Sequence, residues 1–80
     1  MPTTILRLPR VKSYSGLGRS TIYLRISQGL WPKPVRLGAR AVGWPETECE
    51  ALNVARIAGK TDEEIRRLVS RLVVDRAKVV

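Results

Sequence analysis

Glycine and proline divide the first sixty residues of this 80-residue chain into short segments. Proline lacks the backbone N–H that a helix interior or a central strand requires, and glycine readily adopts the left-handed conformation that ends a helix. The breaks fall at Pro9, Gly16, Gly29, Pro32, Pro34, Gly38, Pro45 and Gly59. They are compatible with short helices and one small hairpin, so the predicted fold class is mostly α with a small β-hairpin.

Two short helices are expected within the first thirty residues. Proline at a first helical position loses no hydrogen bond, so the first helix begins near Pro9, after a loose lead-in of residues 1–7, and ends at Gly16. The second helix is expected over about residues 19–28 and ends at Gly29. Two short helices joined by a glycine-containing turn form a helix-turn-helix pattern, although an ordinary helical hairpin has the same spacing.

The second helix has an apolar side and a polar side. Ile22 and Ile26 lie one turn apart and are expected to face inward, with Leu17 packed at the turn. The other side carries Arg19, Ser20, Tyr23 and Ser27. The helix therefore has one face for the core and one face for solvent or a partner.

A β-hairpin is expected after Pro34. Residues 35–37 and 42–44 alternate apolar with small or basic side chains, and residues 38–41 form a loop between them. The shared apolar face is expected to contain Val35, Leu37, Val42 and Trp44, while Arg36 and Arg40 point outward or lie at the tip. A basic hairpin directly after a helix-turn-helix predicts a winged helix-turn-helix, although a solvated hairpin would have the same pattern.

Two further helices are expected in the second half of the chain. Pro45 opens the first, whose buried side is expected to run from Cys49 and Leu52 to Ile57, and Gly59 ends it. A capping-box sequence at residues 61–64 then precedes an apolar stripe at helical spacing, made of Ile65, Leu68, Val69, Leu72 and Val73. We predict a winged helix-turn-helix domain at residues 1–60 and a C-terminal amphipathic helix at residues 61–80. That helix either packs on the domain or serves self-association.

Positive charge is concentrated in the first 45 residues. They contain eight basic residues and no acid, whereas residues 46–80 contain seven of each, so the net charge of +8 comes from the first part. A basic surface attracts polyanions through phosphate contacts and the release of counterions. Solubility or an anionic membrane surface would also account for a basic chain, but such segregation in a short chain favours nucleic acid.

The sequence lacks the residues that several functional classes need. The chain has no histidine and one cysteine, Cys49, which excludes an internal disulfide and a cysteine-rich zinc site and removes the commonest general base. The acids Glu46, Glu48 and Glu50 fit a solvated helix start, and no nucleophile–base pair or phosphate-cradling glycine motif is present. We therefore expect no enzyme activity, cofactor, metal or small-molecule ligand. Without a signal peptide or a membrane span, the expected location is cytoplasmic.

Three stretches of the sequence resemble the AlpA family. They are residues 15–23, residues 29–38 with the run Pro-Lys-Pro-Val-Arg-Leu-Gly, and residues 42–44, which end in Gly-Trp. The family comprises small prophage-type regulators related to the winged-helix DNA-binding domain of MerR proteins and to phage excisionases. The resemblance extends over roughly residues 6–58.

The resemblance implies how such a fold would meet DNA. The second helix would enter the major groove, and the hairpin would lie as a wing against the backbone or the minor groove. By matching position, the groove-facing start of the helix would present Arg19, Ser20, Thr21 and Tyr23, and the wing would present Arg36 and Arg40. With the basic residues Arg25 and Lys33, these side chains make up the predicted DNA-binding set.

Two positions depart from the family pattern. Gly18 stands where a polar helix cap is common. Leu24 stands where a basic residue is common, and it is either a contact to a base methyl group or a repacked core residue.

The leading functional prediction is a double-stranded DNA-binding transcriptional regulator of a prophage or an integrative mobile element. The closest alternative is an excisionase, a recombination directionality factor that binds tandem sites at an attachment site and promotes excision by an integrase. Both would use the same groove contacts and could self-associate along DNA. A protein-interaction adaptor is a further alternative, and RNA binding would usually need more exposed aromatic side chains than Tyr23 provides. No membrane partner is expected.

Overall fold

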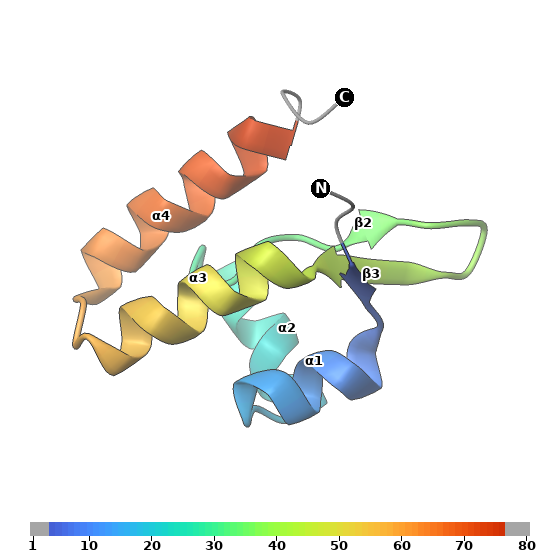
Figure 1. Cartoon of the computed structure of the whole chain (residues 1–80), viewed down its shortest axis with the longest axis horizontal. Helices are drawn as coiled ribbons and strands as arrows, with labels where there is room; N and C mark the ends of the chain where they lie inside the picture. Colours follow the sequence, from blue (N-terminus) through green and yellow to red (C-terminus); the bar gives the residue numbers. More distant parts are fainter. Residues whose placement is uncertain (1–3, 77–80) are drawn as a thin grey trace.

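The computed structural model describes residues 4–76 and has four helices and three short strands in that range. Figure 1 shows their order along the chain: β1 (Ile5–Leu6), α1 (Leu8–Ser15), α2 (Arg19–Ser27), β2 (Val35–Arg36), β3 (Val42–Pro45), α3 (Glu46–Ile57) and α4 (Asp62–Asp75). The predicted fold class, mostly α with a small β-hairpin, is confirmed. No helix in the described range combines the length and the apolar character that crossing a membrane requires.

The first three helices end next to the glycines that were predicted to end them. Gly16 caps α1 with a φ of 74°, in the left-handed region that only glycine adopts without strain, and its N–H donates to the carbonyl of Lys12. Gly29 and Gly59 take the same conformation just after α2 and α3. The predicted capping box also forms at the start of α4, since the amide of Glu64 donates to Thr61 Oγ1 at 3.2 Å and the amide of Thr61 donates to Glu64 Oε1 at 3.1 Å.

The prediction that residues 1–7 form a loose lead-in is wrong for residues 4–7, the part that the structure describes. Ile5 and Leu6 form β1, which pairs antiparallel with β3 and makes it the central strand of the sheet, in the order β1-β3-β2. Leu6 is only 4% exposed, so burial of its side chain accompanies the pairing. A strand of two residues is too short to show the alternating pattern by which a sequence reveals strands.

The predicted apolar face of the hairpin is also wrong. Val35 pairs with Gly43 and Arg36 pairs with Val42, and directly paired residues of an antiparallel ladder share a face of the sheet. Val35 and its second neighbour Leu37 therefore lie on one face, whereas Val42 and Trp44 lie on the other. Trp44 is fully buried and Leu37 is 46% exposed, so only the face of Trp44 belongs to the core.

One hydrophobic core joins the sheet to all four helices. Its buried side chains are Leu6, Val11, Ile22, Leu30, Trp31, Trp44, Cys49, Leu52, Ala55, Ile65 and Val69. The expectation that Ile57 continues the buried side of α3 is wrong, because Ile57 is 86% exposed. Ala55, three residues after Leu52, takes that place, as the helical period requires.

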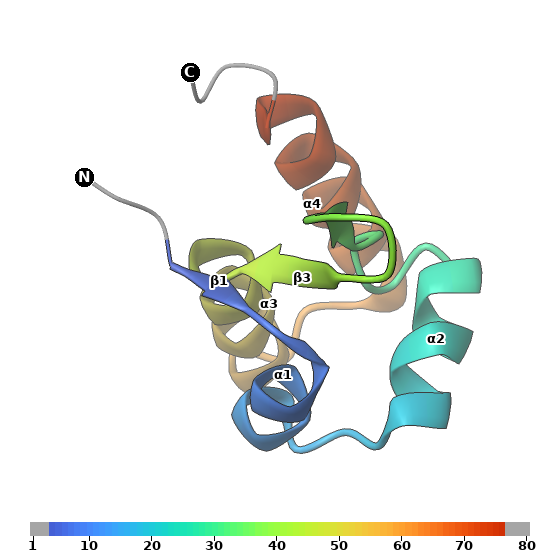
Figure 2. The same cartoon turned by 90° about the vertical axis from the view of Figure 1, so that its right-hand side faces the viewer.

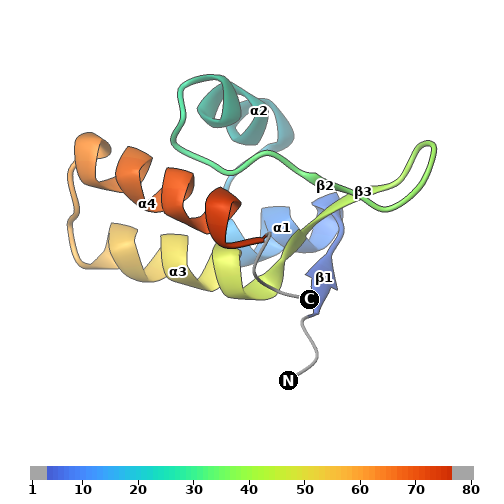
Figure 3. The same ribbon diagram turned by 90° about the horizontal axis from the view of Figure 1, so that it is seen from above.

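The last two helices lie side by side. Figure 3 shows α4 next to α3, with α2 on the far side of α4. Ile65 and Val69 of α4 are buried in the core, and Leu68 and Leu72 pack against it. The apolar stripe of α4 thus contacts the rest of the chain along its length.

Candidate nucleic-acid interface

Helix α2 lies at one edge of the molecule with its polar side open to solvent (Figure 2). Ile22, which has no exposed surface, and the partly buried Ile26 hold its inner side on the core, as predicted. The outer side exposes Arg19, Ser20, Tyr23, Leu24 and Ser27, and Thr21 and Arg25 lie half-buried at its margins. Leu24 is 56% exposed, so the alternative of a repacked core residue is wrong.

The start of α2 carries a restrained cation. The guanidinium carbon of Arg19 lies 5.9 Å from the centroid of the Tyr23 ring, one turn later on the same helix. Such a contact at an exposed site contributes about 0.5–1 kcal/mol. It limits the positions that the Arg19 side chain can take above the helix surface.

The first turn of α2 has no side-chain cap. Gly18 occupies the N-cap position in an extended conformation, with φ −78° and ψ 166°, and no side chain accepts from the first amides of the helix. Those N–H groups carry the positive end of the helix dipole. The end of α2 next to Arg19 therefore offers both a fixed partial charge and a full positive charge to an anion.

The hairpin extends away from the body of the molecule. Figure 3 shows its loop projecting beyond the helices, and the amides of Leu37 and Gly38 close the loop by donating to the carbonyl of Ala41, at 2.7 and 3.2 Å. Arg36 and Arg40 are both exposed on it. In Figures 2 and 3 the loop lies toward the same side of the molecule as α2. The two elements that carry the predicted side chains, α2 and the hairpin loop, thus lie toward one side.

Acidic side chains do not neutralise this side of the molecule. The ion pairs among residues 4–76 are Arg56–Asp62, Lys60–Glu64, Arg66–Glu63 and Arg76–Glu48. All of them lie in the second half of the chain. Within the described range, the eight basic residues of the first 45 form no ion pair with an acid, so their charge remains available to a polyanion.

The interpretation of Glu48 as part of a solvated helix start is wrong, because its side chain is buried. It is 4% exposed, and its two carboxylate oxygens accept from Arg76, Oε1 from Nη2 at 2.6 Å and Oε2 from Nε at 2.8 Å. Glu48 lies one turn before Leu52 on the inner face of α3, and this spacing is the sequence signal that could have revealed it. Nothing in the sequence near Glu48 indicates Arg76, which follows 28 residues later.

The cysteine is buried and unreactive. Cys49 has no exposed surface, and burial raises the pKa of its thiol to about 11, with a smaller contribution from the carboxylate of Glu48. A thiol with this pKa stays protonated at neutral pH and is a poor nucleophile. It therefore acts as a small apolar side chain of the core.

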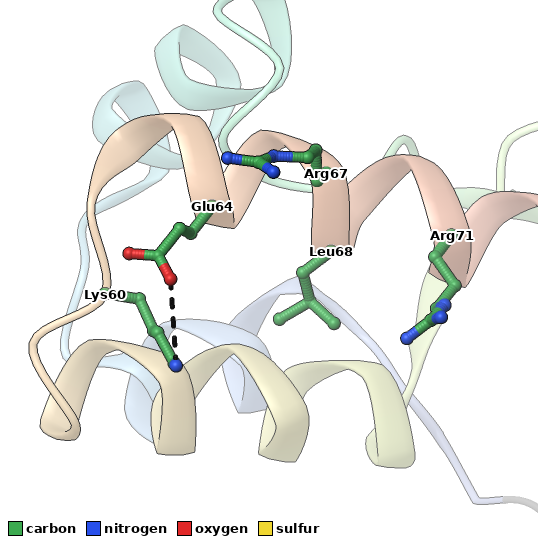
Figure 4. A pocket seen from close by; sticks show the side chains of 5 residues that line it. All are labelled: Lys60, Glu64, Arg67, Leu68 and Arg71. Carbon is green, nitrogen blue, oxygen red and sulfur yellow. Dashed lines mark ion pairs between the residues drawn. The ribbon is translucent and has the colours of Figure 1, made fainter.

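A surface hollow lies along α4, on the side that faces α3 in Figure 4. It measures about 470 Å³ and is lined by Lys60, Glu64, Arg67, Leu68 and Arg71. Figure 4 shows Leu68 pointing toward α3, while the carboxylate of Glu64 faces the ammonium of Lys60 at 3.7 Å. Charged side chains surround it, and no group of acids or cysteine within residues 4–76 has the arrangement of a metal site.

Comparison with known proteins places residues 4–51 in one family. That part of the chain matches the family described as prophage CP4-57 regulatory protein (AlpA). The chain is also 46% identical over 55 residues to an uncharacterized protein, ORF88, of Enterobacteria phage P4. The match covers 69% of this chain and 62% of that relative. No solved structure matches the chain.

Proposed function

Because the chain belongs to the AlpA family of prophage regulatory proteins, we propose that it is a transcriptional regulator that binds double-stranded DNA of a prophage or an integrative mobile element. In this proposal the chain is a winged helix-turn-helix protein. Helix α2 is its recognition helix, and the β2–β3 hairpin is its wing.

One observation carries the proposal. Helix α2 and the hairpin loop lie toward the same side, and the basic side chains of both are unpaired by acids within residues 4–76. An α-helix fits the major groove, where base edges differ in their pattern of donors and acceptors. A projecting loop with arginines suits the flanking phosphates or a narrow minor groove, whose negative potential attracts arginine.

The exposed side chains divide into two roles. On α2, Arg19 and Ser20 can donate to base edges, and Leu24 offers an apolar surface to a thymine methyl group. Tyr23 restrains Arg19, while the half-buried Thr21 and Arg25 lie at the margins of the groove-facing surface. Lys33, Arg36 and Arg40 supply phosphate contacts before and within the wing, where they position the protein more than they select a sequence.

The experiment that tests the proposal is to sequence the genomic fragments that the protein retains. Fragments centred on a promoter of the mobile element are the expected result. Several closely spaced sites beside a recombination core would instead indicate an excisionase that acts with an integrase. A protein in which Arg19, Arg36 and Arg40 are replaced together by alanine serves as the control and should retain none of these fragments. Equal retention by the wild type and this control would contradict DNA recognition through α2 and the wing.

A further inference from the structure

Helix α4 and its C-cap residue Arg76 hold the segment between α2 and the hairpin near both of its ends. We call this segment, residues 28–34, the linker. At one end Arg66 Nε donates to the carbonyl of Gln28 at 2.9 Å, and at the other Arg76 Nη2 donates to the carbonyl of Lys33 at 2.8 Å. Arg76, the C-cap residue of α4, follows Arg66 by ten positions, so at a rise of about 1.5 Å per residue the two Cα atoms lie about 15 Å apart along the helix axis.

The linker depends on such outside contacts. It contains no helix or strand, so its carbonyl groups lack the partners that regular structure provides. Leu30 and Trp31 anchor its middle in the core, and the indole N–H of Trp44 donates to the carbonyl of Pro32 at 2.8 Å. Figure 3 shows the linker running between α2 and α4 before it enters β2.

Both arginines are themselves held in place. A Cβ placed on Gly29 would lie 3.6 Å from Cγ of Arg66, so the stem of Arg66 lies along the linker backbone. Arg76 bonds the buried carboxylate of Glu48 with the same guanidinium that bonds the linker. Moving Arg76 would leave a buried charge without its partner, which is strongly unfavourable.

We propose that Arg66 and Arg76 are positioning residues that fix the spacing and orientation of α2 relative to the hairpin. The inference rests on the proposed function, in which both elements engage one duplex. A rigid linker already holds the hairpin in position when α2 binds. The hairpin can then contact the DNA backbone without a further loss of conformational entropy. Both arginines lie beyond residues 4–51, so the family match does not include this contact.

The test compares Arg66→Gln with Arg67→Gln. Both variants lose one positive charge from an exposed position of α4, but only Arg66 bonds the linker. Dissociation constants on one duplex are measured at fixed salt and well below the melting temperature, for each variant with and without Arg40→Ala. Amide hydrogen exchange of Leu30, whose N–H donates to the carbonyl of Arg25 at 2.8 Å, reports the linker without DNA.

For the proposal to hold, Arg66→Gln must weaken binding about threefold to tenfold more than Arg67→Gln, the factor that one hydrogen bond of ordinary net strength supplies. The additional loss from Arg40→Ala must shrink in the Arg66→Gln background, and the Leu30 amide must exchange faster. A contact that only stabilises the fold would lower the melting temperature and leave these affinities unchanged. Equal affinity and equal exchange in Arg66→Gln and Arg67→Gln would overturn the proposal.

The second contact needs a paired variant, because removing Arg76 alone strands the buried carboxylate of Glu48. Glu48→Leu combined with Arg76→Leu removes both charges and should give the same pattern as Arg66→Gln. Unchanged binding in this double variant would contradict the role of Arg76. A wild-type chain that binds no duplex would overturn the proposed function, and exchange at Leu30 would still decide whether α4 holds the linker.

Discussion

Arg19 lies over the ring of Tyr23, with its guanidinium carbon 5.9 Å from the ring centroid. The two side chains are one turn apart on the exposed side of α2, and the uncapped start of the helix is next to them. An arginine restrained in this way loses less conformational freedom when it pairs with a guanine. The pair therefore links a local contact within one helix to the proposed reading of a base.

Replacement of Arg19 and Tyr23 should have non-additive effects on sequence discrimination. Arg19→Ala should cost about 1–3 kcal/mol of discrimination, the value of a bidentate pair with a base. Tyr23→Ala should lose part of this discrimination, because the ring acts by restraining Arg19. In the Arg19→Ala background, Tyr23→Ala should therefore cause little further loss of discrimination. Affinities for cognate and scrambled duplexes measure both effects, with Ser27→Ala as a control on the same face. Fully additive losses would show that the ring does not restrain the guanidinium.

Loss of the hairpin arginines should weaken binding to every duplex by similar factors. Arg36 and Arg40 are exposed on the hairpin and are proposed to meet phosphate or the minor groove. Arg36→Ala and Arg40→Ala should therefore lower affinity for cognate and scrambled duplexes alike, unlike Arg19→Ala. If the hairpin variants lose discrimination and Arg19→Ala does not, the roles of the two elements are reversed.

Binding to duplex DNA should fall steeply with salt. If about four to seven phosphates are neutralised, the logarithm of the binding constant should decrease with the logarithm of salt concentration with a slope of roughly −4 to −6. Each of Arg36→Ala and Arg40→Ala should make the slope shallower by about one. A titration series from low to moderate salt measures this dependence. A flat slope, or equal affinity for single-stranded RNA, is incompatible with the proposed duplex binding.

Shortening a core side chain of α4 should destabilise the whole fold. Ile65 has no exposed surface, so Ile65→Val should lower the free energy of unfolding by about 0.5–1.5 kcal/mol. For a domain of this size, 1 kcal/mol corresponds to a fall in melting temperature of roughly 4–8 °C. The matched control is Ile57→Val at a position that is 86% exposed, where the change should stay within about 0.5 kcal/mol. Equal melting temperatures for the two variants would mean that α4 does not contribute to the common core.

The capping box should make part of the stability depend on pH. The pKa of Glu64 is lowered first by the hydrogen bond from the backbone of Thr61 and then by that from its hydroxyl. A pKa that is lower in the folded state contributes stability above the unfolded value, near 4.5, and loses it as the pH falls through the folded value. Below about pH 4.5, the melting temperature of the wild type should therefore fall more steeply with decreasing pH than that of Glu64→Gln.

Melting curves between pH 7 and pH 3 measure this difference. Glu50→Gln, an exposed carboxylate on α3, is the control and should follow the wild type. If the curves of Glu64→Gln and the wild type stay parallel across this range, the capping carboxylate does not contribute to acid sensitivity.

The sequence predicted the helices better than the sheet, for a physical reason. Glycine at a left-handed position and the capping box are local signals, and both are read within a few residues of Gly16 or Thr61. Strand pairing depends on partners distant in the sequence, so alternation in residues 35–37 and 42–44 could not reveal which side chains share a face. The two-residue strand β1 gave no periodic signal.

The candidate interface shows the same division. Exposure of Arg19, Tyr23 and the hairpin arginines follows from their place on short amphipathic elements, which the sequence displays. The ion pair of Glu48 with Arg76 joins residues 28 positions apart. A charged residue in a first helical turn ordinarily meets water, so only the packing of α4 on α3 explains its burial.

The close approach of β1 to β3 at Gly43 limits how this family of sequences can vary. A Cβ on Gly43 would lie 2.6 Å from Cγ2 of Ile5 and 2.9 Å from the carbonyl oxygen of Leu6. Backbone cannot yield to such an overlap as the end of a flexible side chain can. In any relative with a side chain at this position, the first strand must lie farther out or pair elsewhere. Substitutions at Gly43 and in the segment that forms β1 are therefore expected to arise together in evolution, even though Gly43 follows Leu6 by 37 positions.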